Sequence, residues 1–172
     1  MIRLSQVTLI RGTKVLLESA DIALNPGDKI GLIGPNGSGK SSLFALLRGE
    51  LHADQGEVDF PARWRVAHVA QETPALDRPA LEYAIDGDTT LRRLERELAA
   101  AEVAEDTELN GIRIGELHAA LGDADAYTAR SRAEQLLHGL GCSHEQMNEP
   151  VANFSGGWRM RLNLAQALMC PS

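Results

Sequence analysis

Hydrophobic residues in the first seventy positions recur in short runs between polar residues, which is the pattern of half-buried β-strands. Polar or glycine-containing breaks separate the runs and predict turns. The runs lie at 2–4, 7–10, 14–17, 20–24, 57–60 and 65–70. The four N-terminal runs predict antiparallel strands. A further run at 29–33 is mostly apolar and follows a turn-prone break at 25–28, so it predicts a short buried strand.

The pattern becomes helical after residue 77, where alanine, leucine, glutamate and arginine predominate. Apolar residues form one helical stripe at 91–101 and a second at 114–121, on either side of a polar break at 105–111. The two stripes predict an antiparallel helical hairpin over about 88–123. Two ordinary surface helices packed on one core would give the same periodicity, so this alternative stays open.

Three other helices are predicted, at 42–48, at 124–140 and from Ser155 through Met169. Ser155 is suited to be the N-cap of the last one, and Gly156 and Gly157 leave its first backbone N–H groups unobstructed. We therefore expect three parts. They are an α/β core at 1–77, a helical part at 78–150 that contains the hairpin, and the last helix with its approach at 151–172.

Composition narrows the class of protein. At 172 residues the chain is long enough for one well-buried core, and its net charge of −7 argues against a globally basic nucleic-acid binder. No run of eighteen apolar residues and no leader pattern is present, which predicts a cytoplasmic protein without membrane insertion. Cys142 and Cys170 are too few for a disulfide framework and are predicted to be buried thiols.

The main chemical signal is the segment Gly34-Pro35-Asn36-Gly37-Ser38-Gly39-Lys40-Ser41, placed between the run at 29–33 and the helix at 42–48. This spacing of glycines, lysine and hydroxyl is typical of a loop whose backbone N–H groups surround phosphates, with the hydroxyl on Mg²⁺. The helix start adds its partial positive charge. ATP and Mg²⁺ are the predicted cofactors. The predicted binding residues are Gly34, Asn36, Gly37, Ser38, Gly39, Lys40, Ser41 and Ser42.

Motif order extends this interpretation. Gln71 ends a predicted strand 31 residues after Lys40, a helical insertion follows, and the segment 154–168 then reads Phe-Ser-Gly-Gly-Trp-Arg-Met-Arg-Leu-Asn-Leu-Ala-Gln-Ala-Leu. Together these features resemble the nucleotide-binding domain of an ATP-binding cassette (ABC) protein. Trp158 stands where transporter cassettes usually carry glutamine, which resembles the first cassette of the ABC-F subfamily.

The resemblance implies a fold class and a set of roles. The fold would be α/β, an ABC-type P-loop NTPase domain with an incomplete RecA-like core, an antiparallel β subdomain, and a helical subdomain carrying a short hairpin arm. Lys40 would bind the β- and γ-phosphates, Ser41 would ligate Mg²⁺, and Gln71 would position the metal and the attacking water. Arg11 occupies the position from which the family often stacks an aromatic residue on adenine. A guanidinium can also stack on a base, which makes Arg11 a candidate for adenine stacking, and an ordinary exposed turn arginine is the alternative.

The resemblance also implies a partner. In this family two cassettes enclose two nucleotides head to tail, so Ser155, Gly156 and Gly157 would contact the ATP of an opposing cassette in the same full-length chain. The Mg²⁺-binding aspartate, the catalytic glutamate and the switch histidine would lie beyond Ser172. We therefore expect the complete protein to be an ATPase and these 172 residues alone to be inactive, monomeric or weakly self-associating.

The implied function is that of an ABC-F ATPase of the translation machinery, with the ribosome and its RNA as partner. The predicted hairpin arm at 88–123 carries four arginines (92, 93, 96 and 113) and nine acidic residues. This balance of charge is unfavourable for strong contacts with the phosphate backbone of RNA. Two alternatives remain open: the ATPase subunit of an ABC membrane transporter, and a nucleotide-gated binding module without turnover. Trp158 and the predicted hairpin favour the ABC-F ATPase over both alternatives.

Overall fold

The structure is a computed structural model that describes residues 1–70, 75–105 and 107–171. The chain forms two compact units, the first spanning Met1–Val66 and the second Ala67–Ser172. This division falls before the predicted boundary at residue 77. It also places the last helix in the same unit as the other helices that follow residue 77.

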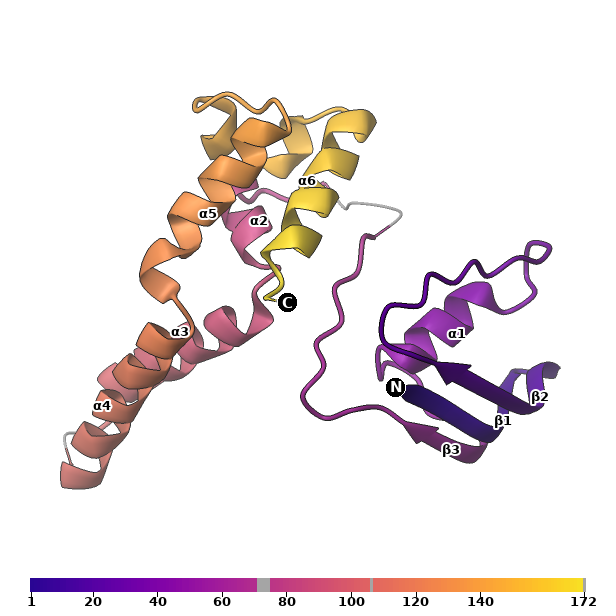
Figure 1. The fold of residues 1–172 in the computed structure, drawn as a ribbon. Helices are drawn as coiled ribbons and strands as arrows, with labels where there is room; N and C mark the ends of the chain where they lie inside the picture. Colours follow the sequence, from indigo (N-terminus) through magenta and orange to yellow (C-terminus); the bar gives the residue numbers. More distant parts are fainter. Residues whose placement is uncertain (71–74, 106, 172) are drawn as a thin grey trace. The chain divides into compact units, whose positions relative to one another are not determined.

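The first unit is a three-stranded antiparallel sheet with one helix against it (Figure 1). The strand order is β2-β1-β3. Its elements are β1 (Ile2–Arg11), β2 (Lys14–Leu24), α1 (Lys40–Leu47) and β3 (Gln55–Asp59). Leu4, Val7 and Leu46 form its buried core, so the sheet and α1 bury their apolar faces against each other.

Antiparallel strands are confirmed at the N-terminus, but the four predicted runs join into two long strands. The polar breaks become irregularities within these strands, because Gln6 and Ser19 adopt positive φ angles of 50° and 45°. The Asp21 carboxylate accepts a hydrogen bond from the Gln6 backbone N–H at 2.9 Å. A side chain thus satisfies a donor near a register shift in the ladder.

Two predicted strands are wrong, because residues 29–33 and 65–70 have no regular secondary structure. Their apolar side chains lie partly or fully in solvent, with Ile33 94% exposed and Ile30 60% exposed. The physical reason is that a strand needs a neighbouring strand to satisfy its backbone N–H and C=O groups. Among the described residues, β1, β2 and β3 pair only with one another.

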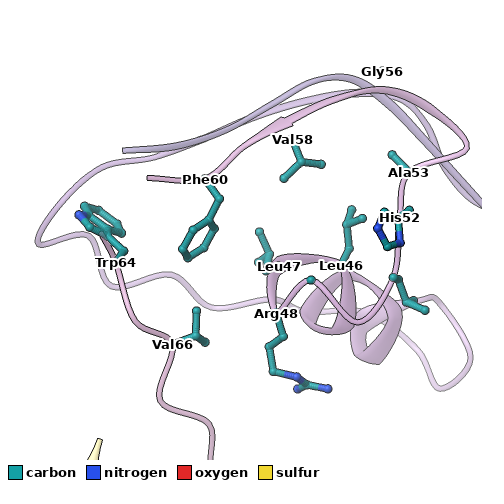
Figure 2. A pocket seen from close by; sticks show the side chains of 12 residues that line it. Leu46, Leu47, Arg48, His52, Ala53, Gly56, Val58, Phe60, Trp64 and Val66 are labelled. Atoms are coloured by element: carbon teal, nitrogen blue, oxygen red, sulfur yellow. The ribbon is translucent and has the colours of Figure 1, made fainter. Parts of the chain in front are cut away.

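An apolar groove of about 690 Å³ lies between the end of α1, β3 and the segment that follows β3. Figure 2 shows Leu47, Val58 and Phe60 pointing into it, with Trp64 at one end. The rings of Phe60 and Trp64 meet edge to face with their centroids 6.4 Å apart. The first unit therefore leaves part of its apolar surface open.

The second unit is helical. Its elements are α2 (Ala80–Ile85), α3 (Thr89–Glu102), α4 (Glu108–Asp123), α5 (Ala126–Gly139), the 3₁₀ turns η1 (Gln146–Asn148) and η2 (Val151–Asn153), and α6 (Gly156–Met169). Figure 1 shows α3 and α4 side by side as a hairpin, which confirms that prediction. The connection is shorter than the predicted break because the hydroxyl of Thr107 caps α4 by accepting from the Asn110 N–H.

The core of the second unit draws on all of its α-helices. Gly87 brings the α2–α3 turn so close to α6 that a Cβ atom there would overlap the carbonyl oxygen of Gln166. Buried Tyr83 donates its hydroxyl to the Asn163 side-chain oxygen at 2.8 Å. Cys142 is buried as predicted, whereas Cys170 is half-buried. No helix in the described ranges has the length and apolarity needed to cross a membrane.

Candidate nucleotide-binding site

The phosphate loop at 34–39 leads directly into α1, which begins at Lys40. Gly37 and Gly39 have φ angles of 76° and 97°, in the left-handed region that side-chain-bearing residues avoid. Gly39 is the N-cap of α1, and no side chain caps this helix. The first N–H groups of an α-helix have no partner within the helix, so this start is available to an anion.

Close packing explains two of the glycines further. A Cβ atom at Gly34 would lie 2.8 Å from the Ser38 hydroxyl oxygen, and one at Gly39 would lie 3.1 Å from the Leu16 Cβ. The loop therefore folds upon itself at Gly34 and against β2 at Gly39. Side chains at these two positions would push the backbone away from the place where it must approach a phosphate.

The ammonium group of Lys40 bends back over the loop. It donates to the carbonyl oxygens of Gly34 at 2.6 Å and Pro35 at 2.8 Å. Because a phosphate oxygen is charged, it would form a stronger hydrogen bond with this ammonium than a neutral carbonyl does. Ser41 is exposed in the first turn of α1, at the same helix start as Lys40. The residues present fit the phosphates of ATP and a Mg²⁺ ion.

A second lysine also contacts this loop, and sequence reasoning missed it. Lys14 follows the turn of the β1–β2 hairpin and donates from Nζ to the carbonyl oxygen of Gly37 at 2.6 Å. Its cross-strand partner in the register is Arg11, so the same hairpin end carries both cations. The signal that could have found Lys14 is its position beside Arg11 in a chain with few lysines.

The hollow beside the loop measures about 260 Å³ and is distinct from the larger groove of Figure 2. Its lining includes Leu17 from β2 and Lys40 from α1. The larger groove is mainly apolar, and its Arg48 is held by two hydrogen bonds to the Glu50 carboxylate. Apolar side chains such as Leu32 and Ile33 also line much of the smaller hollow. The case for an anion therefore rests on the uncapped helix start and on Lys40, not on the lining of either hollow.

The helix start predicted at 155–157 is confirmed as a structural feature of the second unit. Ser155 is the N-cap of α6 and its hydroxyl oxygen accepts from the Trp158 N–H at 3.4 Å. Gly156 and Gly157 are exposed, and a Cβ atom at either would meet nothing within 4 Å. Packing among the described residues therefore gives no reason for two glycines in the first turn of a helix.

Two arginines on α6 hold its N-terminal turn in place. Arg159 donates from Nε to the carbonyl oxygen of Phe154, the residue before the cap, at 2.8 Å. Arg161 lies 4.7 Å from the ring centre of Trp158 and donates from Nη1 to the carbonyl oxygen of Leu140, at the end of α5, at 3.1 Å. These contacts tie the turn at 155–157 to the neighbouring helix.

The structure thus brings the phosphate-loop residues together with the hairpin end that carries Arg11, all within the first unit. Ser155, Gly156 and Gly157 belong to the second unit. Gln71 lies outside the described residues, so its predicted role at the metal and water is untested. Within the described ranges, no group of three or more histidine, cysteine, aspartate or glutamate side chains could hold a metal ion by itself.

Comparison with known proteins now identifies the family. The family described as "ABC transporter" matches residues 17–172. The chain belongs to the ABC transporter family. The cassette is 54% identical over 172 residues to the probable ATP-binding protein YheS of Escherichia coli K12, covering 100% of the chain and 26% of that protein. It is 38% identical to mouse ATP-binding cassette sub-family F member 3, over 97% of the chain and 23% of that protein.

These relatives confirm the predicted ABC cassette and its likeness to sub-family F. The cassette spans about a quarter of the length of the curated relatives it matches. Solved structures add the fold. A nucleotide-free cassette from an ABC transporter matches 98% of the chain and 64% of that cassette, with a TM-score of 0.60 and 23% identity.

A dimeric bacterial ABC transporter cassette matches 98% of the chain and 69% of that cassette, with a TM-score of 0.61 and 21% identity. At these identities the likeness shows the fold alone. It confirms the predicted α/β ABC-type P-loop NTPase fold, here with its antiparallel sheet and helical part. The ABC domain is an ATP-binding domain.

Proposed function

We propose that this cassette belongs to a cytoplasmic ABC-F ATPase that acts on the ribosome during translation, with ATP binding closing it against a second cassette of the same protein. ATP and Mg²⁺ would bind at the phosphate loop, through Lys40 and Ser41. Gln71 would position the metal and the attacking water. The opposing cassette would contact the γ-phosphate of this ATP. Residues 155–157, which we call the signature turn, would contact the γ-phosphate of the ATP bound to the opposing cassette.

One observation carries this proposal. The exposed pair Gly156-Gly157 stands in the first turn of α6 with open space around both positions. Glycine costs a helix about 0.5–1 kcal/mol relative to alanine, so two of them need a reason. The two glycines are explained if the backbone at this helix start must contact a phosphate bound to another cassette. Any side chain there would keep the backbone and the phosphate apart. The Ser155 cap supports the same interpretation.

The hairpin of α3 and α4 gives the proposal its second support, and its charges limit where RNA could be bound. Arg92 pairs with Glu82, Asp86 and Glu95. Burial lowers the pKa of its guanidinium, but the hydrogen bonds that it donates to Glu95 and Glu82 and the negative charge of Asp86 raise the pKa above its ordinary value. Arg93 pairs with Glu97. Because these arginines are neutralised within the chain, the base of the hairpin offers little to a phosphate backbone. We place any RNA contact elsewhere.

The test is ribosome co-sedimentation of the full-length protein with a non-hydrolysable ATP analogue. We expect the parent protein to sediment with ribosomes and Ser155→Arg to abolish this, because added bulk and charge prevent closure. Binding of the analogue at the protein's own phosphate loop should survive the substitution. Ser131→Arg is the matched control, since Ser131 is an exposed serine on α5 of the same unit.

Two results would contradict the proposal in different ways. Unchanged co-sedimentation of Ser155→Arg would refute the shared nucleotide site while leaving the ribosome as partner. Absence of ribosome association with every nucleotide would refute the translation role. It would favour the transporter subunit or the nucleotide-gated binding module instead.

A further inference from the structure

We propose that Lys14 is a second phosphate-binding lysine of the nucleotide site, alongside Lys40. The inference rests on nucleotide binding at the phosphate loop and adds to it a residue from another element. The chain contains three lysines, Lys14, Lys29 and Lys40. Two of the three place their ammonium groups on carbonyl oxygens of the same six-residue loop.

The position of Lys14 is set by the β1–β2 hairpin. Gly12, with a φ of 59°, forms the tight turn with Thr13, and Arg11 pairs with Lys14 across it. The hairpin end reaches the phosphate loop, where the Lys14 ammonium lies 2.6 Å from the carbonyl oxygen of Gly37. Lys40 instead contacts Gly34 and Pro35, at the start of the loop. The two ammonium groups therefore hold different points of the loop, as a ligand with several phosphates would require.

Charge distinguishes a ligand-binding lysine from one that only braces the loop. An ammonium has three donors, and the bond to Gly37 uses one of them. Among the described residues, no carboxylate lies within ion-pair distance of Lys14 or Lys40, whereas Arg92 and Arg93 of the hairpin pair with carboxylates. A chain with a net charge of −7 thus keeps two unneutralised cations at one glycine-rich loop. A polyphosphate is the class of ligand that both would recognise.

Binding of a nucleotide would change the hydrogen-bond partners of both lysines. With no phosphate bound, each ammonium donates to a neutral loop carbonyl. When a nucleoside diphosphate or triphosphate enters, the ammonium groups exchange or share these bonds with charged phosphate oxygens. A hydrogen bond from an ammonium to a charged phosphate oxygen is stronger than one to a neutral carbonyl, so the ligand gains from both lysines. Lys14 stays exposed, which makes its contribution smaller than that of a buried contact.

The experiment is calorimetric titration of the full-length protein with Mg-ADP, which binds without hydrolysis. The decisive variant is Lys14→Gln, because its amide can still donate to the Gly37 carbonyl while the charge is gone. We expect roughly three- to tenfold weaker binding for this variant. Its affinity should also fall less steeply with added salt. Lys14→Arg, which keeps the charge, should stay within about twofold of the parent.

Lys29→Gln is the matched control, since it removes the same charge from the first unit at an exposed lysine. It should leave affinity and salt dependence unchanged. Melting temperatures without nucleotide should agree among all variants, which separates binding from folding.

Parental affinity and salt dependence in Lys14→Gln would overturn the inference and leave Lys14 as a brace of Gly37. An equal loss in Lys29→Gln would also overturn it, because the effect would then be general electrostatics. If Lys40→Ala weakens ADP binding and Lys14→Gln does not, only this inference fails. If the parent protein binds no ADP, the nucleotide site and this inference fail together.

Discussion

The two compact units of the chain bury their apolar residues to different extents. In the second unit, side chains from α2, α3, α4, α5 and α6 meet in one buried cluster. In the first unit the buried cluster consists of Leu4, Val7 and Leu46, and an apolar groove lies open beside it. Apolar side chains such as Ile33 are left in solvent there. The first unit, which carries the phosphate loop, therefore has less hydrophobic stabilisation than the unit that carries the signature turn.

Helix starts differ in how their first backbone N–H groups are satisfied. In the second unit a side-chain oxygen of Asp88, Thr107 or Ser155 caps α3, α4 and α6, whereas α2 and α5 have no side-chain cap. In the first unit α1 begins at Gly39 with no side-chain cap. A capped start stabilises its helix without a ligand, whereas an uncapped start leaves its N–H groups to one. A missing cap does not mark a phosphate site by itself, because α2 and α5 lack one too. The start of α1 differs from theirs because a glycine-rich loop precedes it and the Lys40 ammonium lies over that loop.

The largest expected effect comes from the core of the second unit. Leu137 is 1% exposed, and Leu137→Ala should lower the free energy of unfolding by about 2–5 kcal/mol. Leu46→Ala should cost well under half as much. Leu46 already borders the open groove, so truncation there creates little new cavity. Urea denaturation of both variants measures this, and equal losses would show that the two cores are equally well packed.

The helical half was the more predictable one for a physical reason. A helix satisfies its own backbone hydrogen bonds, so the stripe through Leu91 and Leu94 sufficed to predict α3, and Ser155 sufficed to predict the start of α6. The run at 29–33 has an equally clear apolar pattern, but a strand forms only beside a partner strand. The apolar pattern of this run is typical of a buried strand, but the pattern does not show whether a partner strand is present.

The candidate site also has one part that the sequence predicts and one part that it does not. The phosphate loop was predictable because its glycines and Lys40 act within eight consecutive residues. Lys14 was not, since its contact with Gly37 depends on how a hairpin 23 residues away folds against the loop. Local spacing carries the first kind of information, and only the fold carries the second.

An intermediate effect is expected at the cap of α3. Buried Asp88 accepts from the Leu91 N–H at 3.0 Å, and its other oxygen lies 3.7 Å from Arg132 on α5. Asp88→Ala removes both contacts and should lower the free energy of unfolding by about 1–2 kcal/mol. Asp88→Asn keeps the capping acceptor and removes only the charge, so it should cost less. Thermal unfolding followed by circular dichroism compares them, and equal losses would mean that the charge opposite Arg132 outweighs the cap.

The most direct test of the account measures whether the uncapped start of α1 is a phosphate site. Calorimetric titration with Mg-ADP compares the full-length protein with Lys40→Ala, and with Lys29→Ala as a control of equal charge change. An ammonium–phosphate hydrogen bond contributes about 1.5–3 kcal/mol, so Lys40→Ala should bind roughly ten- to a hundredfold more weakly while Lys29→Ala binds as the parent does. Equal affinity of the parent and Lys40→Ala would contradict the assignment of this loop as the nucleotide-binding site.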